Sequence, residues 1–409
     1  MNTPGLRFKD DNGRDFPDWE EKKVKNVLER YSQSVDVYPE SFYQEIGIRS
    51  HGKGIFHKQP LPGYKLGNKR VFWVKEEALV FNIVFAWEQA VAKVTHKEKG
   101  MIASHRFPMY IAKEGLVSVD FVLEFFLTKT GKILLSLASP GGAGRNKTLG
   151  QKEFENLNIK LPVLKEQTKV ANFLTAVDEK ITQLTKKCDL LAQYKNGVMQ
   201  HIFSQQLRFK DDAGQDFPDW EEIHLGGVLK EHKTRNLKND VKEVFSVAKN
   251  KGVINQIEHL GRSYASKETS NYKVVFPNDV IYTKSPTSNF PLGIIKQNKL
   301  ERTGIVSVLY GVFTPTNKEL GLLLDYYFFN WKNTYNYLNP LAKKGAKNTI
   351  NVSNDDFLNG VAINLPSSIK EQIKITNFLT AIDEKITHTQ TQLKAVKQYK
   401  QGLLQQLFV

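Results

Sequence analysis

The stretch KEQTKVANFLTAVDEKIT, residues 165–182, recurs with few changes as KEQIKITNFLTAIDEKIT, residues 370–387. A second repeat precedes each copy, because LRFKDDNGRDFPDWEE at residues 6–21 returns as LRFKDDAGQDFPDWEE at residues 207–222, with fourteen of sixteen positions identical. The offsets are 205 and 201 residues, and the segments between the repeats do not visibly align. The chain is therefore predicted to use one architecture twice, around two divergent inserts.

Each copy of the longer repeat begins a predicted helix with apolar residues at coiled-coil spacing. Both helices follow a proline, Pro162 or Pro366, and contain none. Each spans roughly 38 residues, or about 57 Å at 1.5 Å per residue. Because one small domain would not cover so long a seam, we expect an antiparallel coiled coil rather than two helices that each pack only on their own half. The predicted seam residues are Phe173, Leu174, Val177, Ile181, Leu184, Leu191, Phe378, Leu379, Ile382, Ile386, Leu393 and Val396.

The two helices differ at their C-terminal ends. The first runs into the LRFKDD repeat at Leu207, whereas the second ends at LLQQLFV, where the sequence stops. The other LRFKDD copy begins at Leu6, near the N-terminus. We therefore expect the N-terminal segment to complete the C-terminal half and to give a pseudo-twofold symmetric molecule. Such symmetry suits two copies of one partner and a two-part site on a duplex.

The inserts carry short apolar runs separated by Gly, Pro and Asn, which indicates mixed α/β globular domains. The predicted fold class is α+β, with two globular domains joined by the two long helices. The expected segments are an N-terminal repeat segment 1–21, a first domain 22–160, a central helix 161–206, a second repeat segment 207–222, a second domain 223–364 and a C-terminal helix 365–409.

The composition favours a polyanionic partner. The 409 residues include 58 Lys and Arg against 43 Asp and Glu, a formal charge of +15. This balance favours nucleic acid over membrane, with a generic basic surface as the alternative. The single cysteine, Cys188, excludes an internal disulfide and fits a reducing cytosol. With no apolar signal core at the start and no run of 18 apolar residues, we expect a cytoplasmic protein without a membrane partner.

No catalytic or metal-binding motif emerges from the sequence. GGAGRNKT, residues 141–148, resembles a phosphate-binding loop but places Asn146 where GxxxxGK[ST] needs its second glycine. The methyltransferase signature [DNS]PP[YFW] and the zinc motifs CxxC and HExxH do not occur. No pattern pairs a nucleophile with a base. The sequence therefore predicts neither a catalytic residue nor a metal ligand in this chain.

The same glycine-rich loop fits a DNA contact better. Arg145 can pair with guanine, Asn146 with adenine and Lys147 with phosphate. At a similar distance before the second helix, KKGAKNT repeats this chemistry in another order, as two domains that recognise different sequences require. For any one residue, the alternative is a solvated basic loop. The candidates in that second loop are Lys343, Lys344, Lys347 and Asn348.

Other candidates are basic or polar residues set among small ones, a pattern that suits access to a DNA groove. We expect the lysines mainly to position the duplex, and Arg, Asn and Ser to contribute more to specificity. In the first insert these are Arg49, Ser50, His51, Lys53, Lys97 and Lys99, and in the second Lys249, Asn250, Arg262, Ser263, Lys284 and Ser285.

Two divergent inserts alternating with two related helices resemble the specificity subunit of type I restriction–modification systems. The matching elements are the NFLTAVDEKI and NFLTAIDEKI helices, the paired FPDWEE segments, the GGAGRNK loop, and the QYKNG and QYKQG continuations at Gln193–Gly197 and Gln398–Gly402. The resemblance covers essentially the whole chain and rests more on this arrangement than on any one motif. The LRFKDD…FPDWE repeat resembles forms found in low-GC Gram-positive bacteria.

The resemblance implies two target-recognition domains, each recognising one half of a bipartite sequence in double-stranded DNA. It implies that the helices set the spacing and dock two modification subunits, which bind S-adenosylmethionine and methylate adenine. Restriction subunits would add translocation and cleavage dependent on ATP and Mg, so this chain itself would carry no cofactor. One alternative is a non-catalytic coiled-coil scaffold with two ligand-binding domains, whose affinity should lack a steep salt dependence. Another alternative is an enzyme with an unrecognised site in one insert. Because an enzyme would usually need one catalytic pocket, two divergent inserts on equal frames argue against it.

Overall fold

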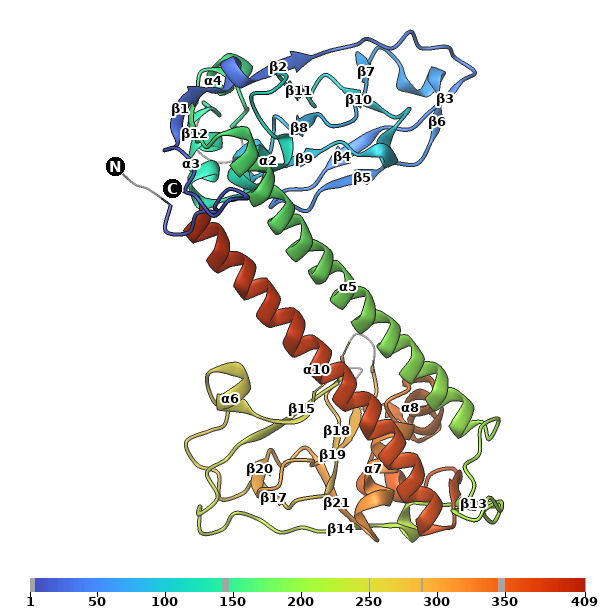
Figure 1. Ribbon diagram of the computed structural model, residues 1–409. Coiled ribbons are helices and arrows are strands. Elements are labelled where there is room, and N and C mark those ends of the chain that lie inside the picture. The colour runs from blue at the N-terminus through green and yellow to red at the C-terminus, as the bar shows by residue number, and fades with distance from the viewer. Residues whose placement is uncertain (1–3, 142–146, 250, 288–289, 345–349, 409) are drawn as a thin grey trace. The chain divides into compact units, whose positions relative to one another are not determined.

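The computed structural model describes residues 4–141, 147–249, 251–287, 290–344 and 350–408. The chain forms two compact units: unit 1 comprises Met1–Thr185 and Thr391–Val409, and unit 2 comprises Lys186–Gln390. Two long helices, α5 (Leu164–Phe203) and α10 (Ile369–Leu407), each contribute one part to each unit (Figure 1). Both begin shortly after the prolines of the sequence, so the prediction of two long helices is confirmed.

Unit 1 contains an antiparallel four-stranded sheet in the order β2-β11-β8-β9, where β2 is Leu28–Tyr31, β11 Met109–Ala112, β8 Leu79–Phe81 and β9 Val91–Lys93. Two-stranded pairs surround it: β1 (Glu20–Lys23) with β12 (Asn158–Leu161), β3 (Phe42–Tyr43) with β6 (Leu61–Pro62), β4 (Ile46–Ile48) with β5 (Ile55–His57), and β7 (Val71–Trp73) with β10 (Ile102–Ser104). The helices are α1 (Val24–Val27), α2 (Val119–Leu127), α3 (Lys129–Leu137) and α4 (Gln151–Glu155), with 3-10 turns η1 (Gly63–Leu66), η2 (Ala86–Glu88) and η3 (His96–Glu98).

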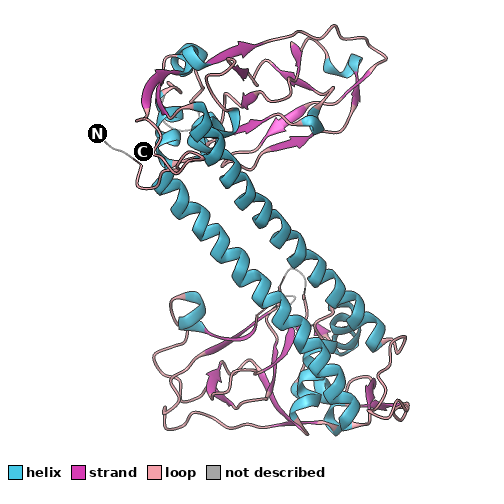
Figure 2. Ribbon diagram, in the orientation of Figure 1, coloured by secondary structure: helices cyan, strands magenta, loops and turns pink. Residues whose placement is uncertain are grey.

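Unit 2 repeats this plan with the sheet order β14-β21-β18-β19, where β14 is Leu229–Glu231, β21 Gly311–Pro315, β18 Val280–Thr283 and β19 Ile294–Gln297. Its pairs are β13 (Trp220–Ile223) with β24 (Ile363–Pro366), β15 (Phe245–Ala248) with β16 (Gly252–Asn255), β17 (Lys273–Val275) with β20 (Gly304–Val306), and β22 (Lys343–Lys344) with β23 (Ile350–Asn351). The helices are α6 (Gln256–Leu260), α7 (Lys318–Tyr327), α8 (Trp331–Leu338) and α9 (Asn354–Leu358), with turns η4 (Leu225–Gly227) and η5 (Asn339–Leu341). Figure 2 shows the mixed helix and strand content of each unit.

Short polar side chains start the helices that cover each sheet. Ser118 and Asn317 accept hydrogen bonds from backbone amides in the first turns of α2 and α7. Thr128 and Asn330 do the same for α3 and α8. Because an N-cap oxygen satisfies an amide that has no partner inside the helix, these residues fix where each helix begins. The matching caps give both units the same helical cover despite their different sequences.

Equivalent aromatic clusters form the two cores. In unit 1, Phe154 of α4 packs against Phe81 at 4.7 Å and Tyr110 at 4.9 Å between ring centroids. In unit 2, Phe357 of α9 packs against Tyr282 at 5.0 Å and Phe313 at 4.9 Å. Burial of one such side chain contributes about 1.5–3 kcal/mol. Within unit 1 the core continues onto early α5 and late α10, and within unit 2 onto late α5 and early α10.

The helix parts run antiparallel inside each unit. In unit 1, Lys400 of α10 donates to Asp178 of α5 at 2.6 Å. In unit 2, Lys195 of α5 donates to Asp383 of α10 at 2.5 Å. Asp178 and Asp383 are equivalent in the repeat, as are Lys195 and Lys400. The same ion pair is therefore made twice with the helices exchanged. All twelve predicted seam residues are buried or half-buried.

The N-terminal segment lies on the end of α10 within unit 1. The Leu6 amide donates to the Gln406 carbonyl at 3.0 Å, just as Leu207 donates to His201 at 3.1 Å in unit 2. Gln406 and His201 occupy equivalent places in the helix repeat. The N-terminal segment, which does not follow α10 in the sequence, thus makes the same backbone contact with the end of α10 that the residues directly after α5 make with the end of α5.

A buried carboxylate anchors each copy of this segment. Arg7 donates to Glu166 at 2.7 Å, and Arg208 donates to Glu371 at 3.0 Å. Both glutamate side chains are fully buried. Because an Arg–carboxylate pair of this kind is directional, it sets the position of the segment on the helix.

Within the described part of the chain, no helix combines the length and apolar character that a membrane span needs.

Candidate nucleic-acid interface

The two predicted DNA-contact loops follow and precede equivalent helices in the chain. Residues 142–146 lie between α3 and α4 in the sequence, and residues 345–349 lie between α8 and α9. Five predicted contact residues lie outside the described residues: Arg145, Asn146, Asn250, Lys347 and Asn348.

In unit 1, the turn η2 brings two predicted segments together. The Lys147 ammonium lies 5.8 Å from the ring centroid of Trp87. The amide of His51, from a loop almost one hundred residues earlier, donates to the carbonyl of Glu88 at 2.7 Å. Both partners belong to Ala86–Glu88. The structure thus gathers Lys147 and the Arg49–Lys53 turn into one region.

Internal contacts already use part of the Arg49–Lys53 turn. The Ser50 hydroxyl donates to the Glu88 carboxylate at 3.1 Å. The Arg49 guanidinium lies 4.7 Å from the Phe56 ring centroid, and Lys53 is exposed. Stacking holds a guanidinium in place while leaving N–H groups for a partner. Internal contacts therefore hold this turn while Arg49 and Lys53 remain exposed.

Lys97 belongs to the same region. It lines, with Gly52 and His57, a cavity of about 430 Å³. His57 bonds to Glu98 at 2.7 Å. Burial opposes ionisation of Glu98, but hydrogen bonds from His57 and Thr95 outweigh it and lower the pKa of this carboxyl. Lys99, just beyond η3, is exposed.

A second basic depression in unit 1 was not predicted from the sequence. It has a volume of about 590 Å³ and is lined by Lys58, Lys69, Arg106 and Phe85, with Glu45 buried beneath. Lys58 and Lys69 reach Glu45 at 3.3 and 3.7 Å. Single basic residues scattered over some fifty positions carry no sequence signal, because only the fold assembles them.

In unit 2, two predicted lysines gather near Asp356. Lys343 is exposed and pairs with Asp356 at 2.8 Å. Lys284 is half-buried; burial and the nearby Lys273 lower its pKa, against the opposing field of Asp356. Ser285, the next residue, is exposed. Asp356 thus partly neutralises the charge of Lys343. Lys147 of unit 1, by contrast, pairs with no carboxylate that the structure describes.

The other unit 2 candidates lean on aromatic rings. Lys249 lies 5.0 Å from the centroid of Phe290, and Arg262 lies 4.6 Å from that of Tyr264. Ser263 donates to Gln256 at 3.4 Å. Grooves that bind single-stranded nucleic acid combine basic and aromatic side chains, although cation–aromatic contacts also occur widely in other proteins. Lys344 lies in β22, which pairs with β23 across the second predicted loop.

Histidine–carboxylate pairs occur in both units. Among the described residues, no group of three or more His, Cys, Asp and Glu could hold a metal ion. His57 bonds to Glu98 at 2.7 Å in unit 1, and His232 bonds to Asp279 at 2.8 Å in unit 2. The Thr314 hydroxyl donates to the same Asp279 carboxylate at 2.9 Å.

Comparisons with known proteins agree with this picture. Residues 65–191 match the family model of the type I restriction modification DNA specificity domain. The type I restriction enzyme MjaVIII specificity subunit of Methanocaldococcus jannaschii is 25% identical over 234 residues, which cover 54% of this chain and 52% of that protein. A putative type I restriction enzyme MjaX specificity subunit from the same organism is 31% identical over 84 residues, covering 19% of this chain and 20% of its own length. The chain thus spans about half or less of these curated relatives.

Two solved structures resemble the fold of this chain. The S subunit of a type I restriction–modification system from M. genitalium superposes with a TM-score of 0.59 at 13% identity, over 100% of this chain and 99% of the other. A chain from a structure of type I system assembly and conformational transition gives 0.50 at 16% identity, over 96% and 98%. At these identities the likeness concerns the fold, and it confirms the predicted α+β class with two domains and two long helices.

Proposed function

We propose that this chain is the DNA specificity subunit of a type I restriction–modification complex, in which each unit recognises one half of a bipartite site. The observation that carries the proposal is the reciprocal frame: Asp178–Lys400 in unit 1 and Asp383–Lys195 in unit 2 hold the same scaffold around unlike inserts. A molecule that recognises two different half-sites in one geometry needs this combination of constant frame and variable insert.

Binding would begin with the phosphate backbone. The charge of +15 and the exposed Lys53, Lys97 and Lys99 would attract the duplex and fix its register. Arginine and amide side chains near the two equivalent loops would then test base edges. Arg49, held over Phe56, and Arg262, held over Tyr264, are the described candidates for this role.

The partners would be two modification subunits, one per symmetric position on the long helices. Tyr194 of α5 and Tyr399 of α10 are equivalent in the repeat and are 52% and 55% exposed. Two large aromatic side chains left in solvent at matching positions favour one docking mode used twice. Modification subunits would supply S-adenosylmethionine and flip the target adenine, and restriction subunits would use ATP and Mg. We place this complex in the cytoplasm, and the LRFKDD…FPDWE repeat favours a low-GC Gram-positive source.

A methylome tests the proposal. The chain would be co-expressed with the modification subunit of a closely related system, and methylated adenines would be mapped by long-read sequencing. We expect a two-part motif with a fixed gap that disappears when this chain is omitted. A stable complex without any motif would contradict the proposal and favour the scaffold alternative, which also predicts ligand affinity without a steep salt dependence.

A further inference from the structure

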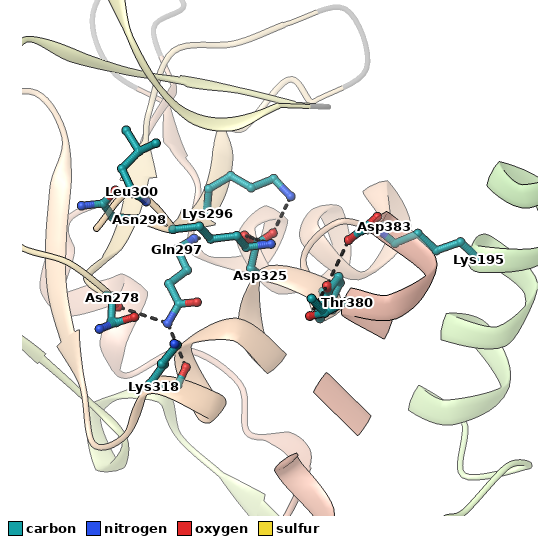
Figure 3. A network of polar contacts seen from close by, with 12 residues as sticks. Lys195, Asn278, Lys296, Gln297, Asn298, Leu300, Lys318, Asp325, Thr380 and Asp383 are labelled. Atoms are coloured by element: carbon teal, nitrogen blue, oxygen red, sulfur yellow. Dashed lines mark hydrogen bonds and ion pairs between the residues drawn. The ribbon is translucent and has the colours of Figure 1, made fainter. Parts of the chain in front are cut away.

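Unit 2 contains a buried ion pair between its sheet and α7. Lys296 of β19 donates to Asp325 at 2.6 Å, and the Gln297 amide donates to the same carboxylate at 3.2 Å. Figure 3 shows Lys296 directed toward Asp325, with Lys195 reaching Asp383 nearby. The Lys296 and Asp325 side chains are only 5% and 3% exposed. Two charges have therefore been taken almost completely out of water.

The sheet position of Lys296 is apolar in unit 1. Val80 of β8 pairs with Ala92 of β9, and Ile281 of β18 pairs with Lys296 of β19. Val80 and Ile281 hold the same place in their strands. In unit 1, the residue before Val80 pairs with the buried Tyr110 of β11, and in unit 2, the residue before Ile281 pairs with the buried Phe313 of β21. Ala92 is therefore the unit 1 counterpart of Lys296.

The helix position of Asp325 is apolar as well. Glu124 of α2 contacts Lys400, and Tyr326 of α7 lies 4.9 Å from Lys195, the equivalent lysine. The residues before them are Leu123 and Asp325. Unit 1 thus fills both positions with apolar side chains and keeps the same fold. Since a buried ion pair gives no more stability than a well-packed apolar pair, the charges in unit 2 call for another role.

The pair borders a cavity with surplus positive charge. This cavity, about 350 Å³, is lined by five lysines and two aspartates among the described residues. Lys299 also reaches Asp325, at 3.3 Å. Burial lowers the pKa of Lys296, and repulsion from Lys299 and Lys195 lowers it further against the attraction of Asp325. An anion in this space would relieve that repulsion.

A second cavity shares Lys195 and Phe329 with the first. It measures about 610 Å³ and is lined by Trp331, which is 51% exposed, and by the amides of Asn196 and Gln200. Aromatic faces stack with planar rings, and amides bond to the edges of such rings. Each of the two cavities has a volume within the range of small-molecule sites.

We propose that this cavity of unit 2 binds a free nucleoside phosphate, with its phosphates at Lys296, Lys299 and Lys195 and its base at Trp331. The site is independent of the duplex-recognition role and belongs to unit 2 alone, because unit 1 has Ala92 and Leu123 in place of the ion pair.

Titration calorimetry on the full chain tests this site. The probes are the four ribonucleoside triphosphates and inorganic tripolyphosphate at constant ionic strength. We expect saturable binding, with tripolyphosphate as a weaker competitor. The double variant Lys296→Ala/Asp325→Leu, which carries the residues of unit 1, should weaken binding at least tenfold. Lys299→Ala should also weaken it, and because this side chain is half-exposed the variant provides a second test if the double variant fails to fold.

The control is Lys93→Ala in unit 1, which should bind as the wild type does. Absence of binding by the wild type, equal binding by Lys299→Ala and the wild type, or tripolyphosphate binding as tightly as the nucleotides would overturn the proposal. The methylation motif reports separately on the specificity role, because it depends on both inserts and not on this cavity.

Discussion

Units 1 and 2 share their frame and differ in what they build on it. Arg7–Glu166 and Arg208–Glu371 are the same contact in two copies. The sheets have the same order, and the two predicted loops fall between equivalent helices in the sequence. By contrast, unit 2 adds a buried ion pair where unit 1 is apolar. Under the proposed function, the frame would determine where recognition residues lie, and the inserts would determine what they recognise.

The junction between frame and insert also differs. In unit 1, Lys400 serves two carboxylates, Asp178 and Glu124. In unit 2, the equivalent lysine, Lys195, pairs with one carboxylate, Asp383. The place of Glu124 is taken by Tyr326, whose hydroxyl donates to Asp383 at 3.0 Å. The lysine of unit 1 thus faces two carboxylates, whereas the lysine of unit 2 faces one. This difference gives the two units different responses to mutation and pH.

The largest expected difference comes from the ion pair of unit 2. Asp325→Ala leaves Lys296 buried without a carboxylate partner and should cost about 3–5 kcal/mol in the free energy of unfolding. The matched variant Leu123→Ala removes only a half-buried apolar contact, at about 1 kcal/mol. Urea unfolding of both variants measures the difference. Equal losses would show that the pair is not effectively buried.

The double variant Lys296→Ala/Asp325→Leu sharpens the same comparison. Since it removes both charges together and restores the apolar pattern of unit 1, its unfolding free energy should recover to within about 1–2 kcal/mol of the wild type. A loss that adds the effects of the two single variants would contradict the equivalence with Ala92 and Leu123.

The Arg–Glu anchors should fail differently in the two units. Arg7→Ala and Arg208→Ala each leave a buried carboxylate without its guanidinium, at about 1–3 kcal/mol. However, Leu207 remains joined to α5 by the chain, whereas Leu6 is held to α10 only by non-covalent contacts. Hydrogen exchange should therefore rise over residues 6–21 in Arg7→Ala more than over 207–222 in Arg208→Ala. The opposite order would mean that the N-terminal segment is anchored elsewhere.

A smaller difference is expected in DNA binding. Lys147→Ala should lower affinity a few-fold and reduce the slope of log K against log salt by about 1, because no described carboxylate balances this lysine. Lys343→Ala should do less, since Asp356 already pairs with Lys343. Fluorescence anisotropy on the cognate duplex at several salt concentrations measures both. A larger effect for Lys343→Ala would reverse our assignment of the free charge.

The smallest effect concerns pH. Burial raises the pKa of Glu124 above 4.5, and Asp178 adds to this against the attraction of Lys400. Its contribution to stability is therefore full below pH 4.5 and is lost as the pH rises through the folded-state value. Asp325 behaves oppositely: its pKa is lowered from 3.8 to about 2, so its contribution is present above pH 3.8 and is lost toward pH 2.

The variant Glu124→Gln should abolish the pH dependence that Glu124 gives to the stability of unit 1. Melting temperatures from pH 4 to 8 should show the wild type losing stability relative to this variant as the pH rises. A constant difference across that range would mean that Glu124 keeps the same protonation state throughout.

Sequence reasoning was strongest where physical constraints are local. Heptad spacing after Pro162 and Pro366 was enough to predict α5 and α10, because a long apolar seam has few other structures available. The apolar run Ile133–Ala138, however, falls largely in α3 and Val280–Tyr282 in β18, and short apolar runs do not distinguish these outcomes. Strand order could not be predicted, since the inserts share no visible pattern.

The candidate sites were predictable only in part. Glycine-rich loops with basic residues drew attention to Lys147, and repeat spacing to its counterpart near Lys343. Nothing in the sequence linked Lys147 to the turn at His51, because η2 joins them through tertiary contacts. Lys296 belongs to no motif in the sequence, and only the fold buries it against Asp325.

The most direct measurement is the methylome of a chain in which the unit 2 insert, residues 223–364, is replaced by a second copy of the unit 1 insert, residues 22–160. If a constant frame presents two independent recognition inserts, the motif should become an inverted repeat of the unit 1 half-site with its gap unchanged. Persistence of the wild-type motif, or loss of both half-sites in a folded complex, would contradict the account.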